Sequence, residues 1–318
     1  MAKKNITIFE IFLQGLGLYF SNIDRFLIYM LFPILGQLAG LVITVCLLYF
    51  FANYNTMLLA SLPILKNQTY ANITIAVVLF PAIILWVKSF ADYMIAYSAV
   101  NSMTDNMLKS ERVYDFPAHT KMVTRRAFAY FNLCVMFLAL MFLTSIPIFM
   151  VFGWILLVYY AFIFQIFIFE PELSPGDCFK KSASYVSGNF KRTFSMIALV
   201  GTFTYIIIPQ LVLTFLTTVK AVDWLKNLIV PYISVPSLDS VNMVLSAMGI
   251  AQIMPKQVAL FIVQFLIIIM VIQLLLPLRV ICMCLWYKNF YNNAGAMKKI
   301  DDRILDRAGV PTKKKRKK

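Results

Sequence analysis

Residues 127–169, with the sequence AFAYFNLCVMFLALMFLTSIPIFMVFGWILLVYYAFIFQIFIF, contain no charged side chain. A membrane-spanning helix needs about 20 mostly apolar residues, and this stretch is about twice that long. The run Ser145-Ile146-Pro147 near its middle is typical of a tight turn. The sequence therefore predicts two membrane spans joined by a short turn.

The rest of the chain has the same apolar character. Of its 318 residues, 61% are hydrophobic and 14% are charged, whereas a soluble domain is about 45–50% apolar and about 25% charged. These figures exclude an ordinary soluble domain, a disordered chain, a collagen and a secreted disulfide scaffold. We therefore expect an all-α, polytopic membrane protein.

Four further apolar stretches are long enough to span a bilayer, at about residues 26–51, 73–99, 193–217 and 258–287. Six transmembrane helices place both termini on the same side. Loops and ends on that side hold 24 of the 29 Lys and Arg residues, and the opposite side holds four. The positive-inside rule then predicts cytoplasmic termini.

A short internal repeat precedes the first and fifth spans. Residues 7–27 (TIFEIFLQGLGLYFSNIDRFL) align without gaps to residues 174–194 (SPGDCFKKSASYVSGNFKRTF) at an offset of 167 residues. Each copy begins with a Thr or Ser that can cap a helix, carries an acid three residues later, and ends in Asn-x-x-Arg. The pattern predicts an interfacial amphipathic helix on the cytoplasmic face that turns at the Asn and enters the membrane.

The two copies point the same way because four spans separate them, so we expect tandem parallel repeats. A third, weaker copy precedes the third span. We predict one six-helix membrane domain over residues 1–288, with repeat units at about 5–100, 101–170 and 171–288. Residues 289–318 would form a basic cytoplasmic tail.

The second copy and the residues before it also resemble a motif of known bacterial proteins. The motif elements are Glu170, Lys181-Ser182, Gly188-Asn189 and Arg192, with Tyr185 where a Trp is usual. In this segment the chain is similar to the membrane domain of glycerophosphoryl diester phosphodiesterases and to YciC-like membrane proteins. The resemblance implies a six-helix protein of the bacterial inner membrane with no established reaction, because the phosphodiesterase chemistry belongs to a separate barrel that this chain lacks.

Three charged residues within the spans are candidates for a ligand or lipid site. Lys88 and Asp92 lie four residues apart in the second span, nearer its expected cytoplasmic end, and Arg279 follows Pro277 in the sixth. A charge at the bilayer centre costs about 2.5–3.5 kcal/mol on insertion scales, so such residues are functional candidates. The alternative is a self-neutralising pair at positions 88 and 92 and an arginine that snorkels to the headgroups.

Asn22, Arg25, Asn189 and Arg192 are a second candidate set, because they could form a collar that binds lipid headgroups. The alternative is helix capping with positive-inside anchoring. The tail could bind anionic lipid, although a solvated tail would look the same. Its basic residues are Lys313, Lys314, Lys315, Arg316, Lys317 and Lys318.

The chain has too few polar residues that could converge for us to propose an active site. His119 is the only histidine, which excludes the HExxH metalloprotease motif, and the phosphate-loop signature does not occur. The five cysteines include no CxxC pair. We therefore expect no catalytic residues, no metal site and no cofactor.

Our leading hypothesis is a non-catalytic integral membrane protein that binds lipid headgroups or a partner protein at the cytoplasmic face. It would act in envelope organisation or lipid handling, with anionic membrane lipids, and with a protein partner or a second copy of itself, rather than with nucleic acid. The alternative is a transporter or channel for an anionic or amphipathic solute. A lipid-modifying enzyme is a third class.

Overall fold

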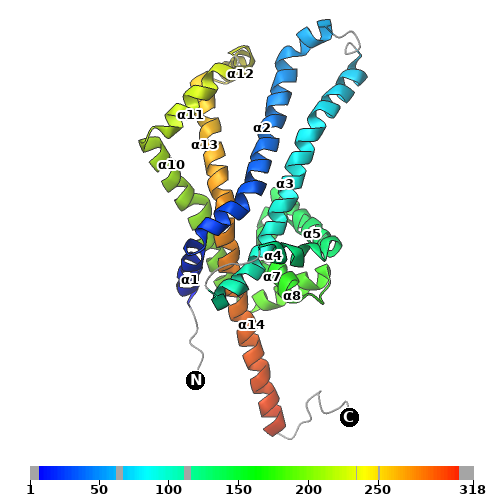
Figure 1. The fold of residues 1–318 in the computed structure, drawn as a ribbon, viewed down its shortest axis with the longest axis vertical. Coiled ribbons are helices and arrows are strands. Elements are labelled where there is room, and N and C mark those ends of the chain that lie inside the picture. Colours follow the sequence, from blue (N-terminus) through cyan, green and yellow to red (C-terminus); the bar gives the residue numbers. More distant parts are fainter. Residues whose placement is uncertain (1–6, 62–66, 111–115, 234, 250, 308–318) are drawn as a thin grey trace. The chain divides into compact units, whose positions relative to one another are not determined.

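The computed structural model describes residues 7–61, 67–110, 116–233, 235–249 and 251–307, and every regular element in these residues is helical (Figure 1). The first half holds α1 (Ile8–Phe20), α2 (Ile23–Ser61), α3 (Gln68–Ser110), α4 (Phe116–Thr124), α5 (Ala127–Ser145), α6 (Met150–Tyr159), α7 (Ile163–Phe169) and α8 (Pro175–Ser187). The second half holds α9 (Phe190–Gly201), the π-helix η2 (Thr202–Ile207), α10 (Ile208–Thr218), α11 (Ala221–Ile229), the 3-10 turn η3 (Val230–Tyr232), α12 (Val235–Ala247), α13 (Pro255–Leu274) and α14 (Leu276–Arg307).

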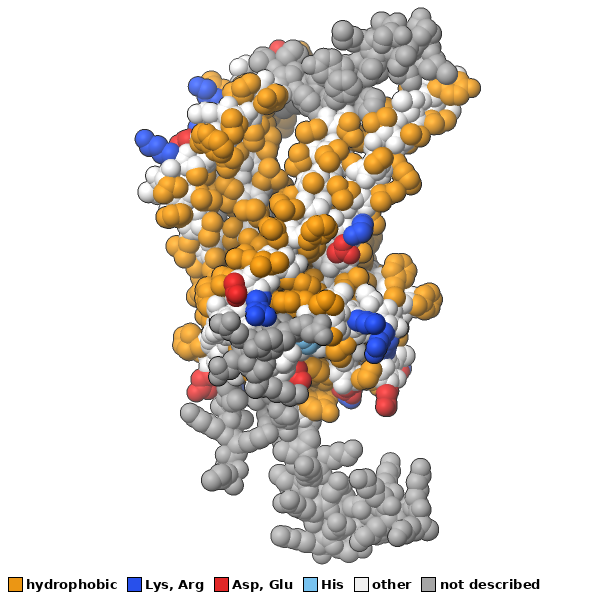
Figure 2. All heavy atoms as spheres, in the orientation of Figure 1, with side chains coloured by type: hydrophobic (Ala, Val, Ile, Leu, Met, Phe, Trp, Pro, Cys, Tyr) orange, Lys and Arg blue, Asp and Glu red, His pale blue; other side chains and the backbone are white. Residues whose placement is uncertain are grey.

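Six helical segments among the described residues are long and apolar enough to cross a membrane, as the sequence predicts. They are Ile23–Leu48, Thr69–Leu108, Ala127–Ser145, Met150–Phe169, Phe190–Thr218 and Pro255–Tyr291. Hydrophobic side chains also cover most of the described surface seen in Figure 2. The chain is therefore consistent with an integral, multi-pass membrane protein.

The chain divides into two compact units. Unit 1 contains Met1–Ile23, Tyr97–Val200 and Pro277–Lys318, and unit 2 contains Asp24–Ala96 and Gly201–Leu276. The expectation of a single six-helix domain remains a prediction. Each unit is described by itself below.

Local sequence explains where α1 and α8 begin. The hydroxyl of Thr7 accepts a hydrogen bond from the Glu10 N–H, and the Glu10 carboxylate accepts one from the Thr7 N–H. This capping box satisfies two donors that a helix start leaves unpaired. Ser174 accepts from the Asp177 N–H in the same way, with Pro175 as the first helical residue. The bounds of α1 and α8 differ by 167 residues at both ends, and so do the starts of α2 and α9.

Helix α3 extends further than the sequence predicted. It has 43 residues, which corresponds to about 64 Å at 1.5 Å per residue and is about twice the hydrocarbon thickness. The helix continues beyond residue 99, where the sequence predicted the end of the span, and polar residues of its last turns are buried inside unit 1. These are Ser98, Asn101, Ser102 and Thr104.

The fourth predicted span is broken. Helix α6 ends at Tyr159, residues 160–162 form a turn, and α7 begins at Ile163. Residues 163–168 of α7 are all buried. An apolar run gives no hydropathy signal for such a break, so the sequence predicted one continuous helix.

In unit 2, α2 and α3 approach closely where α2 carries Gly36-x-x-x-Gly40. A Cβ atom on Gly40 would lie 2.8 Å from the Trp86 backbone nitrogen. Small residues four apart allow membrane helices to approach in this way. Beside them, the Gln273 amide of α13 donates to the Gln37 side chain at 2.9 Å, and the Gln37 amide donates to the Ser89 carbonyl at 3.3 Å.

We predict that Gly40→Ala lowers the stability of the protein, because its methyl group would overlap the backbone of α3. The cost should be about 1–3 kcal/mol, measured as a lower midpoint of thermal unfolding in detergent. Gly17→Ala is the matched control, since nothing lies within 4 Å of a Cβ built there. The control should gain up to about 1 kcal/mol through helix propensity. Equal midpoints for the two variants would contradict this account of the α2–α3 approach.

Candidate functional site

Lys88 and Asp92 pair with each other in unit 2. The Lys88 ammonium lies 2.7 Å from the Asp92 carboxylate, and the two side chains are 65% and 38% exposed. The pair lies near the middle of the apolar segment Thr69–Leu108. The two charges are thus mutually compensated on the outside of a helix.

Asn22 and Asn189 occupy equivalent places between helices. The Asn22 side chain is fully buried, and its amide donates to the Leu18 carbonyl at 3.0 Å, near the end of α1. The backbone N–H of Asn189 bonds the Val186 carbonyl, and its carbonyl accepts from Thr193 at the start of α9. Their observed bonds are therefore those of helix termini.

The two arginines of the same motif lie in different units. Arg192 is exposed, and its guanidinium lies 5.5 Å from the centre of the buried Trp286 ring, whose N–H donates to Thr193. Arg25 is half-buried at the start of α2. A headgroup ligand could thus reach Arg192 without disturbing the buried ring beneath it.

Arg279 of α14 lies close enough to Tyr19 of α1 to affect the pKa of the tyrosine hydroxyl. Burial raises the pKa of the Tyr19 hydroxyl to about 12, and the positive charge of Arg279 opposes this rise. In the same contact region, Gly15 of α1 lies against Cys282 of α14, where a Cβ on the glycine would overlap the sulfur.

The predicted tail site, from Lys313 to Lys318, lies outside the described residues.

Ser182 stabilises the break between α6 and α7. The sequence pointed to this residue only as part of the motif that carries the resemblance. The hydroxyl of Ser182 in α8 donates to the Tyr159 carbonyl at 2.8 Å and accepts from the Phe162 N–H at 3.1 Å. Both are backbone groups that the turn would otherwise leave unpaired. Ser182 thus replaces the helical hydrogen bonds lost at the break.

Arg126 fixes the other end of this region. Its guanidinium donates to the carbonyls of Phe167 at 3.1 Å and Leu173 at 2.8 Å, and it lies over the Phe167 ring. These bonds tie the start of α5 to the end of α7 and to the loop that leads into α8. Arg126 therefore serves the fold, unlike the exposed Arg125 beside it.

Two ion pairs lie close to α14: one joins α14 to α3, and the other joins α8 to the residue that follows α7. Glu170 pairs with Lys181 and accepts a hydrogen bond from the Tyr287 hydroxyl at 3.1 Å. Asp105 pairs with Lys288. Burial is the largest single influence on Lys181 and acts to lower its pKa, but the hydrogen bond to Glu170 and the electrostatic attractions of Tyr185, Glu170 and Tyr291 together raise it.

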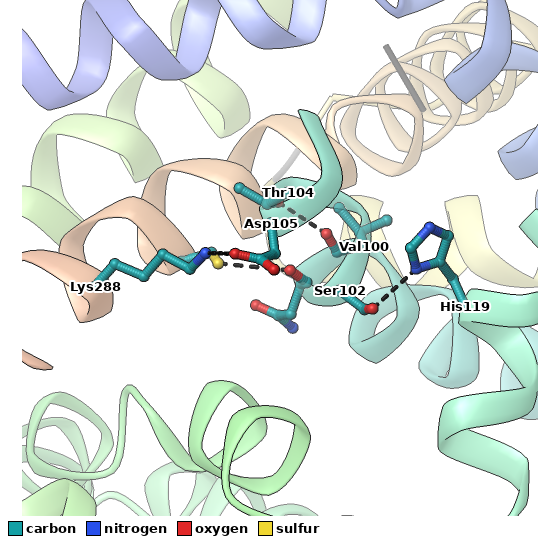
Figure 3. Close-up of polar contacts among 8 residues, drawn as sticks. Val100, Ser102, Thr104, Asp105, His119 and Lys288 are labelled. Carbon is teal, nitrogen blue, oxygen red and sulfur yellow. Dashed lines mark hydrogen bonds and ion pairs between the residues drawn. The ribbon is translucent and has the colours of Figure 1, made fainter. Parts of the chain in front are cut away.

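Polar side chains of α3 contact His119, the only histidine in the sequence, and Figure 3 shows the contact with Ser102. The Ser102 hydroxyl lies 2.8 Å from Nδ1 of His119, and the Asn106 amide nitrogen lies 3.4 Å from Nε2. Because that amide nitrogen can only donate, Nε2 accepts and Nδ1 carries the proton in this arrangement. The Ser102 hydroxyl in turn donates to the Met122 sulfur. The histidine thus attaches α4 to α3.

These contacts bring motif residues 170, 181 and 182 together around α7. In these contacts Glu170 and Lys181 are paired with each other, and Ser182 is bonded to the backbone. Among the described residues, no three His, Cys, Asp or Glu side chains lie close enough to hold a metal ion. Comparisons with protein-family models, with curated proteins and with solved structures found no match to this chain.

We predict that Ser182→Ala destabilises the protein by about 1–3 kcal/mol, since it removes the hydrogen-bond partner of a buried N–H and of a part-buried carbonyl. Ser187→Ala on the exposed side of α8 is the control and should change stability by less than about 0.5 kcal/mol. The readout is the thermal unfolding midpoint in detergent. A Ser182→Ala midpoint equal to that of the control would show that the hydroxyl does not support the break.

We also predict that Cys178 resists alkylation in the folded protein. Its side chain is buried, and burial raises the thiol pKa to about 11 against the opposing charge of Arg126. At pH 8 only about one molecule in a thousand would carry the reactive thiolate. Peptide mass spectrometry after N-ethylmaleimide treatment should show Cys178 modified only after unfolding, whereas an introduced Ser187→Cys reacts at once. Rapid modification of both positions would refute the burial of α8.

Proposed function

We propose that this chain is a non-catalytic, multi-pass protein of the bacterial inner membrane that binds anionic lipid headgroups at its cytoplasmic face. Both termini would lie in the cytoplasm, on the side that carries most of the basic residues. Envelope organisation or lipid handling would be its cellular role.

The proposal rests chiefly on the surplus of unpaired cations in unit 1. Its carboxylates at positions 105, 170 and 177 are engaged by Lys288, Lys181 and Lys180. Four exposed basic side chains have no acidic partner among the described residues: Lys121, Arg125, Lys191 and Arg192. Three of them lie next to the first residues of α5 and α9, where apolar spans begin. Cations at the end of an apolar span are suited to phosphate groups of lipids.

Helix α1 supports an interfacial position. It buries Ile11, Phe12 and Tyr19 against the protein, and it exposes Phe9, Leu13 and Phe20. A helix with a second, outward apolar face fits the boundary between headgroups and acyl chains.

Helix α8 has the same bounds at the 167-residue offset, which supports tandem parallel repeats. Its exposed face is polar, with Lys180, Ser184 and Ser187.

The motif residues Glu170, Lys181 and Ser182 hold α7, α8 and α14 together, which supports the resemblance as a structural one. Collar binding by Arg25 and Arg192 and lipid binding by residues 313–318 remain part of this proposal.

The transporter alternative has weaker support. It needs unbalanced charges along a pathway, whereas Lys88 and Asp92 neutralise each other on an exposed helix face. A solute pathway would have to use Arg279, which lies beside Tyr19.

We predict that neutralising three of the exposed cations reduces binding of anionic lipid. The protein would be placed in nanodiscs of phosphatidylcholine and phosphatidylglycerol and then released from them. Native mass spectrometry would measure how much phosphatidylglycerol it retains. The variant Arg125→Gln/Lys191→Gln/Arg192→Gln should retain phosphatidylglycerol at least about tenfold less, since each basic residue contributes about 1 kcal/mol.

The control variant is Lys220→Gln/Lys226→Gln/Lys256→Gln, which removes three cations from the proposed opposite side. It should retain phosphatidylglycerol as the unmodified protein does. Equal retention by both variants would refute headgroup binding at this face, and a co-purified protein in place of lipid would favour an adaptor role.

A further inference from the structure

Helix α11 follows directly after the fifth apolar segment. That segment ends at Thr218, and α11 begins at Ala221. Lys220 makes the turn between them, with a left-handed backbone (φ near 60°) and its N–H bonded to the Thr217 carbonyl at 3.0 Å. The chain therefore changes direction at the point where an apolar span ends.

One face of α11 is held by unit 2 itself. The helix packs on α10 and α13, which belong to the same unit and to the fifth and sixth apolar segments. Val222 is almost fully buried, and Leu225 and Ile229 are half-buried. These three residues are three and four positions apart, so they lie on one face of the helix. Helix α11 is thus fixed beside two apolar helices.

The remaining surface of α11 is divided into two sectors. Asp223 and Asn227, four residues apart, form an exposed polar sector. Trp224 and Leu228, also four residues apart, are 63% and 51% exposed and form an apolar sector. One side of the helix therefore suits water, and the side next to it suits hydrocarbon.

The apolar sector follows an exposed apolar stripe on α10 and the turn after it. Leu211, Phe215 and Val219 recur every four residues, and each is more than half exposed. Acyl chains are the medium that such a stripe meets on a membrane span. Tryptophan is enriched where acyl chains meet headgroups, because its ring is apolar and its N–H is polar. Trp224 has this chemistry and comes directly after the end of the stripe.

A protein partner fits the apolar sector less well. Its two side chains, of at most about 250 Å² each, fall short of the about 800 Å² that one partner contributes to a stable interface. Charge gives α11 little attraction to a partner either, since Asp223 pairs with Lys226 at 2.5 Å.

We propose that α11 is an interfacial helix that lies in the headgroup boundary of the leaflet where the fifth apolar segment ends. Its polar sector faces water, and Trp224 and Leu228 contact the upper part of the acyl chains. Its partner is the lipid bilayer, which it binds by apolar contact rather than through anionic headgroups. The inference does not depend on which side of the membrane is cytoplasmic; with cytoplasmic termini, as the proposed function has it, this leaflet is the outer one.

Spin labels on both sectors test this position. Trp224→Cys and Leu228→Cys report on the apolar sector, and Asp223→Cys and Asn227→Cys report on the polar sector. Leu211→Cys, on the exposed stripe of α10, is the reference inside the span. Two positions in each sector keep the comparison valid if one variant fails to fold.

Each label is introduced together with Cys46→Ala and Cys134→Ala, since Cys178, Cys282 and Cys284 are buried. The protein is reconstituted in vesicles of phosphatidylcholine alone, so that anionic headgroups play no part. Relaxation of the label by oxygen, which concentrates in hydrocarbon, is compared with relaxation by a water-soluble nickel complex.

The oxygen-to-nickel ratio should be several-fold higher at positions 224 and 228 than at 223 and 227, and highest at position 211. Equal low ratios at all four positions of α11 would place the helix in water. Ratios at all four that equal the ratio at position 211 would place it in hydrocarbon, and either result would overturn the inference. Weak relaxation by both agents at 224 and 228 would show that a protein surface, such as a second copy, covers the apolar sector, which would also overturn it.

Discussion

The hydrogen-bonding requirement of the backbone shapes unit 1. A helix that stops inside an apolar region leaves N–H and carbonyl groups without partners, and each such group is costly where water is excluded. At the break between α6 and α7, the Ser182 hydroxyl meets this requirement by acting as donor to one group and acceptor to another. The Arg126 guanidinium donates to two further carbonyls, one near the end of α7 and one in the loop that follows it. The position of α8 follows, because it must present Ser182 to the break.

In unit 1, some charged side chains form ion pairs with each other and others are exposed without an acidic partner among the described residues. Glu170 and Asp105 are each matched by a lysine from another helix, and Tyr287 and Lys288 are neighbours on α14. Half-buried pairs of this kind are costly to break although they contribute modestly as a whole. Three of the acids in unit 1 are paired with lysines, and four exposed basic side chains have no acidic partner among the described residues.

Much of the helical plan could be predicted from sequence because hydropathy and capping are local properties. The six apolar segments and the starts of α1 and α8 follow from composition and from Thr7, Glu10 and Ser174. The break after Tyr159 could not be predicted, since it depends on a serine 23 residues away. The extension of α3 was missed because its polar turns are buried by other helices, which hydropathy cannot show. The Gly36-x-x-x-Gly40 spacing was a usable signal for the α2–α3 approach that the sequence reasoning overlooked.

The sequence could likewise suggest some contacts of the candidate site residues but not others. The pairing of Lys88 with Asp92 is set by their spacing on one helix, so the sequence could suggest it. The contacts of Arg126, Glu170, Asp105 and His119 join residues that are distant in the chain. No pattern in one sequence specifies which helices meet, so these partners emerged only from the tertiary structure.

The two repeat copies show that helix bounds and helix environment are determined separately. Capping residues set where α1 and α8 begin, and both helices have 13 residues. Their exposed faces differ, because Phe9 and Leu13 of α1 correspond at the 167-residue offset to Gly176 and Lys180 of α8. The exposed face of α1 is therefore apolar, with Phe9 and Leu13, whereas the exposed face of α8 carries Lys180. Two helices with matching bounds can therefore differ in the chemistry of the face that they expose.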